Sequence, residues 1–419
     1  MPTPAEEAAF TRSIVARSRD DGPRHIFADY LDDSPHPADR GRAEFIRLQL
    51  ALARIPDDHP HRGDLAERQN ELLLRHADEW TRHLKGLADG FEFRRGIVDS
   101  VTVSVGLLAA RGEELFRKAA VRRVRIEDAG AHVARLIQLP ILGEVRELGL
   151  CGAGLENGGL NVFLRSPHLG RVEALDLSFN GISDAGVWRL AECRNLPALT
   201  ALHLNDNGQI TAAGVKRLAE SPHFGGLKVL DLSANDVGDG GMAALAHSRQ
   251  LGRLHTVRVR NNHIGDAGCE ALAGSPLFAR MVAHEPLLDL RQNAINSAGL
   301  KALTGCPLLA GVRVLDLSHN YIGDDGLIAL AESPHTAKLT TLLLRQNPIT
   351  DAGAVRLARS ELMPRLERVD LSDNSRLGRR GIDALWAHRR DFHTLIECDG
   401  PPPAAKSPRV AGDVTRRPT

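Results

Sequence analysis

Two short stretches carry residue types that could bind a metal ion or a phosphate group. Residues 57–64, DDHPHRGD, include His59, His61 and carboxylates, which are common metal ligands, but their spacing matches no recognised metal motif. The glycines of VGDGGM, residues 237–242, lack the lysine of a phosphate-binding loop. No nucleophile elbow or paired catalytic motif stands out elsewhere. The sequence therefore predicts no catalytic, cofactor-binding or metal-binding residues, and a protein that is not an enzyme.

Composition favours a protein partner over nucleic acid or a membrane. The chain has 419 residues, with 53 basic and 53 acidic side chains and a pI near 7.3. Such a neutral balance gives no overall electrostatic field that would attract nucleic acid or an anionic membrane surface. No apolar run reaches the roughly 18 residues that a membrane-spanning helix needs. We therefore expect a soluble protein that binds neither nucleic acid nor a membrane.

The cysteines and the amino terminus predict a cytoplasmic location. The five cysteines are widely spaced and form no C-x-x-C pair, so they indicate neither a disulfide framework nor a zinc site. The first ten residues, MPTPAEEAAF, lack the cationic start and the apolar core of a secretory signal. Both features are typical of a protein in a reducing compartment.

Most of the chain consists of one repeated unit, best seen in residues 312–330, VRVLDLSHNYIGDDGLIAL. Its apolar residues stand at fixed offsets from Asn320, an asparagine position that we call the index asparagine. This position recurs at steps of 27 residues, apart from one step of 28 and one of 31. The index asparagines are Asn180, Asn207, Asn235, Asn262, Asn293, Asn320, Asn347 and Asn374. One unit cannot bury its own apolar face, so the units must stack as a solenoid.

Each residue type in the unit has a predicted structural role. The leucines of a short strand point inward, and the residues between them point to the opposite face. The index asparagine can bond backbone groups of its own and the adjacent turn. A glycine near each helix start allows close approach of the neighbouring turn. Short oxygen-bearing side chains are expected to cap the helix that follows them, namely Ser183 or Asp184, Thr211, Asp239, Asp266, Asn296 or Ser297, Asp324, and Thr350 or Asp351.

The unit, L-x-x-L-x-L-x-x-N followed by an apolar residue and a G-x-x-x-L helix, resembles the leucine-rich repeat of the ribonuclease-inhibitor type. The resemblance covers residues 145–398 and implies nine repeats, the first with Ala153 in place of the index asparagine. Strands lie about 4.8 Å apart and packed helices about 8 to 10 Å apart, so the array should curve. We therefore predict an α/β horseshoe solenoid with parallel strands on the concave face and helices on the convex face.

A second resemblance covers residues 5–52. The segments DDGPRHIFADYLDD and GRAEFIRLQLAL resemble a bacterial repeat-companion domain, a short module found ahead of repeat arrays, to which no enzymatic activity is attached. Its recurring pattern is matched by Asp21, Arg24, Ala28, Asp29, Leu31, Ala43, Glu44, Phe45, Ile46 and Gln49. The resemblance implies a bacterial protein. The charged residues Asp29, Arg42, Glu44 and Arg47 are expected on helix surfaces or at helix caps.

These patterns divide the chain into four predicted segments. The first is a small, mainly helical companion domain over residues 1–89, with a helix beginning at Arg42 because the prolines and glycine of the preceding ten residues interrupt helical structure. Residues 90–144 form a transition and a degenerate capping repeat, starting with one strand over residues 90–105. The solenoid spans residues 145–398. Residues 399–419 are proline-rich and predicted to be disordered.

The outward strand positions of the repeats form the predicted partner-binding surface. The residues predicted to contact a partner are His203, Asp231, Arg258, Arg260, Asp289, Arg291, Asp316, Arg345 and Asp370. In a functional interpretation the arginines meet carboxylates of the partner. In a structural interpretation they pair with the aspartates of the same surface. Aromatic residues, the usual anchors of a tight interface, are absent from these columns.

The 31-residue step between Asn262 and Asn293 holds an insertion, residues 275–286, SPLFARMVAHEP. Insertions in repeat arrays map to loops that can contact partners. Phe278 and Met281 can equally pack over the core at this point.

Together these features predict a non-catalytic scaffold that binds a protein on the concave face. The repeats are also similar to those of Ran GTPase-activating protein, so the alternative is a regulator of a small GTPase.

Overall fold

The computed structural model describes residues 4–17, 20–55, 61–389 and 395–399. These residues divide between two compact units, unit 1 (Met1–Arg258) and unit 2 (Val259–Thr419). The predicted disordered tail, apart from Asp399, and His59 of the DDHPHRGD segment lie outside the described residues.

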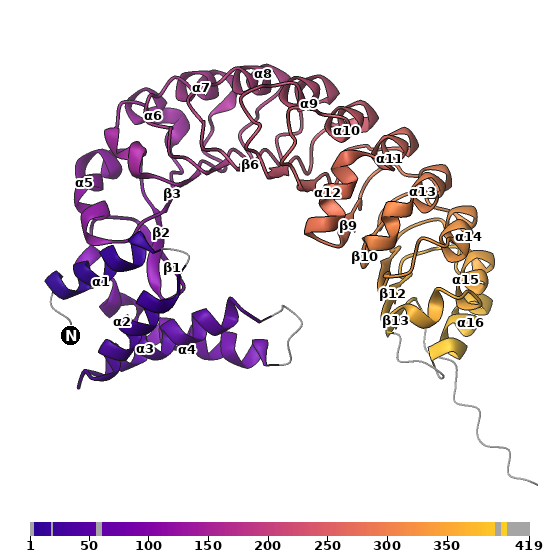
Figure 1. Ribbon diagram of the computed structural model, residues 1–419, viewed down its shortest axis with the longest axis horizontal. Coiled ribbons are helices and arrows are strands. Elements are labelled where there is room, and N and C mark those ends of the chain that lie inside the picture. The colour runs from indigo at the N-terminus through magenta and orange to yellow at the C-terminus, as the bar shows by residue number, and fades with distance from the viewer. Residues whose placement is uncertain (1–3, 18–19, 56–60, 390–394, 400–419) are drawn as a thin grey trace, which may run out of the picture. The chain divides into compact units, whose positions relative to one another are not determined.

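Unit 1 starts with four helices and continues as alternating strands and helices (Figure 1). Its helices are α1 Pro4–Ala16, α2 Gly22–Asp32, α3 Pro37–Leu52, α4 Arg62–Trp80, α5 Val105–Lys118, α6 Ala129–Leu136, α7 Glu156–Phe163, α8 Asp184–Ala191, α9 Ala212–Ala219 and α10 Gly238–Ala246, with 3-10 turns η1 Arg82–Leu84 and η2 Pro140–Glu144. Its strands are β1 Gly90–Arg94, β2 Ile97–Thr102, β3 Arg123–Arg125, β4 Glu147–Gly149, β5 Ala174–Asp176, β6 Ala201–His203, β7 Val229–Asp231 and β8 Thr256–Arg258. They form one sheet in sequence order, antiparallel between β1 and β2 and parallel from β2 onward.

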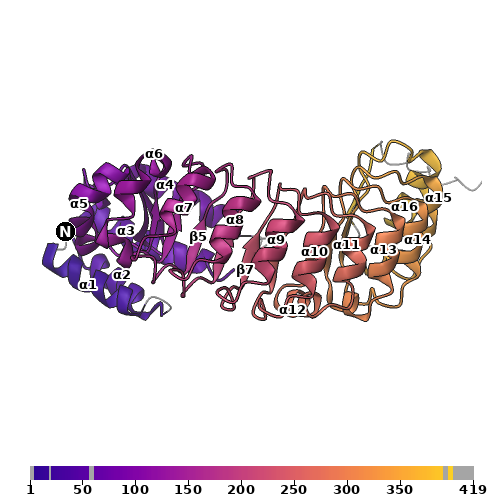
Figure 2. The same cartoon turned by 90° about the horizontal axis from the view of Figure 1, so that it is seen from above.

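Unit 2 repeats the same alternation. Its helices are α11 Asp266–Leu272, α12 Pro276–His284, α13 Ser297–Thr304, α14 Asp324–Glu332, α15 Asp351–Ala358 and α16 Arg379–Arg389, with 3-10 turns η3 Pro307–Gly311 and η4 Met363–Arg365. Its strands are β9 Leu287–Asp289, β10 Val314–Asp316, β11 Thr341–Leu343, β12 Arg368–Asp370 and β13 Leu395–Glu397, all parallel and in sequence order. Neighbouring helices lie side by side, α8 with α9 in unit 1 and α14 with α15 in unit 2 (Figure 2).

The predicted fold class is confirmed. In each unit a parallel sheet and a row of helices enclose the leucines of the repeat, as in Leu315, Leu317 and Leu330, none of which has any exposed surface. Every strand from β3 onward has only three residues, so the repeat is stabilised by burial between turns rather than by long strands. Among the described residues, no helix is both long and apolar enough to cross a membrane.

The first helices differ from the prediction in two places. Helix α3 begins at Pro37 rather than Arg42, because proline fits the first turn of a helix and the His36 ring accepts a hydrogen bond from the Ala38 amide at 3.3 Å. Arg42 is buried instead of lying on the surface. Its guanidinium pairs with Glu7 of α1 at 2.6 Å and lies 5.1 Å from the centre of the Phe27 ring. Sequence spacing could not show that α1 covers this position.

The other three charged residues expected on helix surfaces or at caps, Asp29, Glu44 and Arg47, are at least partly exposed, as predicted. Arg47 bonds Asp29 and Asp32, each at 2.6 Å, and Arg68 bonds Glu44 at 2.7 Å. These ion pairs are half-exposed and contribute little stability each, because solvent screens them.

The predicted single strand over residues 90–105 is wrong, because the chain folds there as the hairpin β1–β2 and then enters α5. The turn holds Arg95 and Gly96 at positive φ, 49° and 86°. A side chain on Gly96 would lie 2.3 Å from Ile46 of α3, and its amide donates to the Gln49 side chain at 2.6 Å. Gln49, part of the companion pattern, therefore ties the helices to the sheet.

Asp266 and Asp324 were expected to cap the helix that follows them, and this is wrong. Asp184 and Asp351, each one of two candidate caps, bond elsewhere as well. Each of the four aspartates reaches the next turn of the solenoid. Asp184, for example, accepts hydrogen bonds from the backbone amides of Thr211 at 2.8 Å and Gly214 at 3.0 Å. These side chains connect successive turns rather than completing one helix. Thr211 and Thr350 do cap their own helices.

The same contact explains four of the helix-start glycines, Gly214, Gly299, Gly353 and Gly381, and gives a prediction. A Cβ on Gly214 would lie 2.4 Å from Asp184 Oδ1, so we expect Gly214→Ala to destabilise unit 1 by about 1 to 3 kcal/mol. Gly158 of α7 has open space around its Cβ position, so Gly158→Ala should stabilise by about 0.5 to 1 kcal/mol. Urea unfolding of the two variants measures both. Equal shifts in the midpoint would contradict the proposed role of the aspartate.

Candidate functional site

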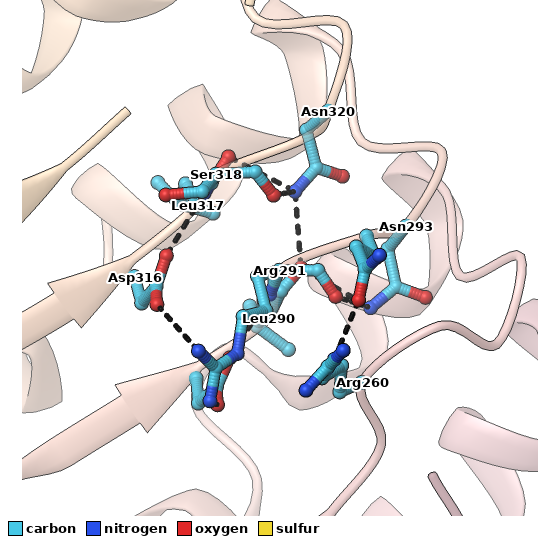
Figure 3. A network of polar contacts seen from close by, with 10 residues as sticks. Arg260, Leu290, Arg291, Asn293, Asp316, Leu317, Ser318 and Asn320 are labelled. Carbon is cyan, nitrogen blue, oxygen red and sulfur yellow. Dashed lines mark hydrogen bonds and ion pairs between the residues drawn. The ribbon is translucent and has the colours of Figure 1, made fainter. Parts of the chain in front are cut away.

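The index asparagines position the outward face of each sheet. Asn320 is 5% exposed, and its amide nitrogen donates to the carbonyl oxygens of Leu290 and Leu317, both at 3.0 Å (Figure 3). Its oxygen accepts from the Ile295 amide at 3.0 Å. The same pair of bonds, to backbone carbonyls of two adjacent turns that no strand pairing satisfies, is made by Asn180, Asn207, Asn235, Asn293, Asn347 and Asn374. The predicted asparagine ladder is confirmed within both units.

The residue before each index asparagine adopts the left-handed backbone conformation. Its φ lies between 53° and 58° in all eight repeats. The eight residues are Phe179, Asp206, Ala234, Asn261, Gln292, His319, Gln346 and Asp373. Half of them are Asp, Asn or His, which tolerate this conformation best, and none is glycine. Because the residue types at this position differ from repeat to repeat, the sequence does not reveal that they share one backbone conformation. They line one edge of the strands, which we call the loop edge.

The outward strand positions form columns in register within each unit, as predicted. In unit 1, His203 pairs across the strands with Asp231, and Asp231 with Arg258. In unit 2, Asp289, Asp316, Leu343 and Asp370 occupy the same column on successive strands. We call these surfaces the unit 1 strand face and the unit 2 strand face.

Two predicted contact residues, Asp316 and Asp370, are almost fully covered. They are 6% and 9% exposed. Asp316 accepts a hydrogen bond from the Ser318 amide at 3.0 Å, and Asp370 accepts one from the Ser372 amide at 2.9 Å. An aspartate that bonds the amide two residues ahead stabilises the turn that leaves the strand. The main role of these two carboxylates is therefore to stabilise the turn that follows their own strand.

Two of the four strand-face arginines, Arg258 and Arg291, pair with the aspartate columns, as the structural interpretation predicts. Arg291 lies 2.8 Å from Asp289 and 3.7 Å from Asp316 (Figure 3). On the unit 1 strand face, Arg258 lies 3.8 Å from Asp231. Both arginine side chains remain about half-exposed. Burial raises the pKa of Asp289. The hydrogen bonds that Asp289 accepts from Arg291, and the positive charge of Arg291, oppose that rise.

Arg260 and Arg345 point instead toward the loop edge. Arg345 Nε donates to Asp373 at 2.6 Å, and this bond raises the pKa of Arg345 above its usual value. Arg260 Nε donates to the side-chain oxygen of Gln292 at 2.5 Å. In unit 2 the structure therefore holds Arg260, Arg291 and Arg345 in fixed directions without burying them. Preorganised guanidinium groups lose little conformational entropy when they bind carboxylates.

Two exposed aromatic residues at the loop edge were missed by the sequence reasoning. Phe179 is 58% exposed on unit 1, and Tyr321 is 63% exposed on unit 2. Phe179 directly precedes Asn180 and Tyr321 directly follows Asn320, so both lie outside the strand columns. The signal was available, because these positions flank a buried asparagine and vary from repeat to repeat.

Tyr321 lines a pocket of about 370 Å³ at the unit 2 loop edge. Its other walls come from the following two turns and include Gln346, Pro348 and Asp373. Among the described residues, no group of three or more His, Cys, Asp or Glu side chains could hold a metal ion.

The insertion between Asn262 and Asn293 forms helix α12. Ser275 caps it by accepting from the Phe278 amide at 3.1 Å. Leu277 and Phe278 are fully buried and Met281 is 9% exposed. The interpretation in which this segment packs over the core is therefore confirmed, while a contact with a partner stays a prediction.

Two solved structures are similar to this chain at low sequence identity. The structure is similar to an internalin, inlF, from Listeria monocytogenes, at 16% identity and a TM-score of 0.41, covering 88% of this chain and 94% of that chain. It is also similar to a chain from the yeast Rad7 and Elc1 complex, at 12% identity and a TM-score of 0.41, covering 88% and 95%. No curated protein matches the chain by sequence.

A family model described as Leucine Rich repeat matches six stretches of the sequence. They are residues 172–191, 195–219, 227–246, 254–273, 312–331 and 335–358. The chain therefore contains leucine-rich repeats, in both units.

Proposed function

We propose that this chain is a non-catalytic scaffold that binds a protein partner, and that the unit 2 strand face is the docking surface. The observation that carries the proposal is the set of half-exposed arginines, Arg260, Arg291 and Arg345, each held by a neighbour on the sheet or loop edge. Held in this way, they can form paired hydrogen bonds with carboxylates of a partner. Asp289 and the covered Asp316 position Arg291, and Asp370 lies in the same column. His203, Asp231 and Arg258 form a second candidate surface on unit 1.

The finer identity of the chain is proposed on sequence grounds. The 27-residue period supports repeats of the ribonuclease-inhibitor type, and helices α1–α4 support a bacterial repeat-companion domain over residues 1–89. The neutral charge balance supports a protein partner rather than nucleic acid or a membrane. The cysteine pattern supports a cytoplasmic location.

The test compares two matched double variants. Arg291→Gln/Arg345→Gln removes two charges from the unit 2 strand face. Arg356→Gln/Arg379→Gln removes two charges from helices α15 and α16, where both arginines are also ion-paired and half-exposed. A partner captured by the full chain is purified, and its Kd is measured by calorimetry.

We expect the strand-face variant to weaken binding at least about tenfold, or about 1.4 kcal/mol, because partner carboxylates lose their charged donors. The helix variant should keep the wild-type Kd. An equal Kd for all three proteins, or equal weakening by both variants, would reject the unit 2 strand face as the docking surface.

A further inference from the structure

The helix side of unit 1 carries an exposed tryptophan. Trp188 of α8 is 51% exposed. Helices α8, α9 and α10 lie side by side in sequence order (Figure 2). Trp188 is the fifth residue of α8 and Lys216 is the fifth residue of α9, so the two occupy the same position on adjacent helices. Exposed tryptophans are typical anchors of protein interfaces, because they offer a large apolar area.

The surface between α9 and α10 is hollow because α10 has short side chains there. Trp188 and Lys216 stand two residues after the glycine of their helix, where α10 has Ala243. The next residue is arginine in α8 and in α9, but Ala244 in α10. Ala244 and Gly240 line a pocket of about 540 Å³, which also takes in Lys216 of α9. The volume is within the range of pockets that bind small molecules or single side chains.

The cations of this pocket lack acidic partners. Lys216 and Arg249 stand exposed in its wall and form no ion pair with any residue that the structure describes. In the described part of the chain, Glu220 is the one acidic residue of the wall, so one positive charge is in excess. A neighbouring helix cation is matched instead, since Arg217 lies 3.1 Å from Glu192. An excess of positive charge beside an exposed aromatic ring complements an acidic partner.

We propose that Trp188, Lys216 and Arg249, which we call the Trp188 surface, bind an acidic segment of a protein partner. An apolar side chain of the segment packs on Trp188, and its carboxylates enter the pocket to meet Lys216 and Arg249. Packed helices lie about 8 to 10 Å apart, so the distance from α8 to α10 is about 16 to 20 Å. Five or six residues of extended chain cover that distance at about 3.3 Å each. The Trp188 surface is formed by helices of unit 1, so the proposal does not depend on the unit 2 strand face.

The test uses the full chain and a labelled hexapeptide, acetyl-LLAAEE-amide, whose binding is followed by fluorescence anisotropy. Lys216→Gln/Arg249→Gln is expected to raise the Kd at least about tenfold, because the peptide carboxylates lose their charged partners. Trp188→Ala should also raise the Kd at least about tenfold, because the apolar end of the peptide loses its anchor. All three positions are exposed, so these variants should unfold at the urea midpoint of the wild type.

The matched control is Arg111→Gln/Lys118→Gln. It also removes one arginine and one lysine from unit 1, but on α5, where both are ion-paired with Glu114 and half-exposed. This variant should keep the wild-type Kd, because its charges lie outside the Trp188 surface.

Four results would overturn the proposal. The first is the absence of saturable binding by the wild type, and the second is an equal rise in Kd in the control. The third is an equal Kd for the basic peptide acetyl-LLAAKK-amide, which would show that charge does not select the partner. The fourth is an oligothymidylate that binds more tightly than the acidic peptide and loses affinity in the same variants, because the partner would then be a nucleic acid.

Discussion

Asn320→Ala is expected to lower the free energy of unfolding by about 2 to 5 kcal/mol. The side chain is buried and bonds backbone groups of Leu290, Ile295 and Leu317. Alanine would leave these groups without a partner in a place that water does not reach, at about 1 to 3 kcal/mol for each unsatisfied group. The urea midpoint of unit 2 measures the effect.

Asn296→Ala is the matched control for this prediction. Asn296 lies one turn away on the chain but is exposed, and its side chain makes only long hydrogen bonds of 3.4 Å. We expect a change of less than about 0.5 kcal/mol, as for most surface substitutions. A similar loss in both variants would show that the asparagine ladder is not what stabilises the loop edge.

Leu317→Ala should destabilise unit 2 by about 2 to 5 kcal/mol as well. Leu317 has no exposed surface and fills the space between the sheet and the helices, so its removal loses apolar burial and leaves a cavity. In a solenoid each turn contacts only its neighbours, so the loss falls on the turns that adjoin β10. Hydrogen exchange of these turns, together with the urea midpoint, locates and measures it.

Leu343→Ala provides the comparison for Leu317→Ala. Leu343 is a leucine on the adjacent strand β11, but it faces outward in the Asp289 column and is only half-buried. Its replacement should cost well under half as much. If the two variants unfold at the same urea concentration, the assignment of inward and outward strand positions is wrong.

The repeat architecture was predictable because its determinants are local and recur. A leucine at a fixed offset from an asparagine has the same burial in every turn, so Leu315, Leu317 and Asn320 show their roles through repetition alone. The insertion at Phe278 was also placed correctly, because one longer step stands out against a regular period. In each case the period of the pattern carries the information.

The errors concern contacts between residues far apart in the sequence. Arg42 is buried because Glu7 of another helix neutralises it, and Asp184 bonds amides of the following turn. Position 96, in the β1–β2 turn, requires glycine because Ile46 of α3 leaves no room for a side chain. Spacing within one segment cannot reveal such partners.

The sequence by itself determined the solenoid, the inward leucines, the asparagine ladder and the register that brings Asp289, Asp316 and Asp370 into one column. Periodicity suffices for these, because stacking identical units admits one register. Only the tertiary structure decided which candidate residues remain available to a partner. In the structure Asp316 and Asp370 are almost fully covered, whereas Arg291 and Arg345 are half-exposed. Tyr321 lines a pocket at the unit 2 loop edge. The physical reason is that exposure depends on how adjacent turns satisfy each other's backbone groups, which is a property of pairs of turns rather than of any one segment.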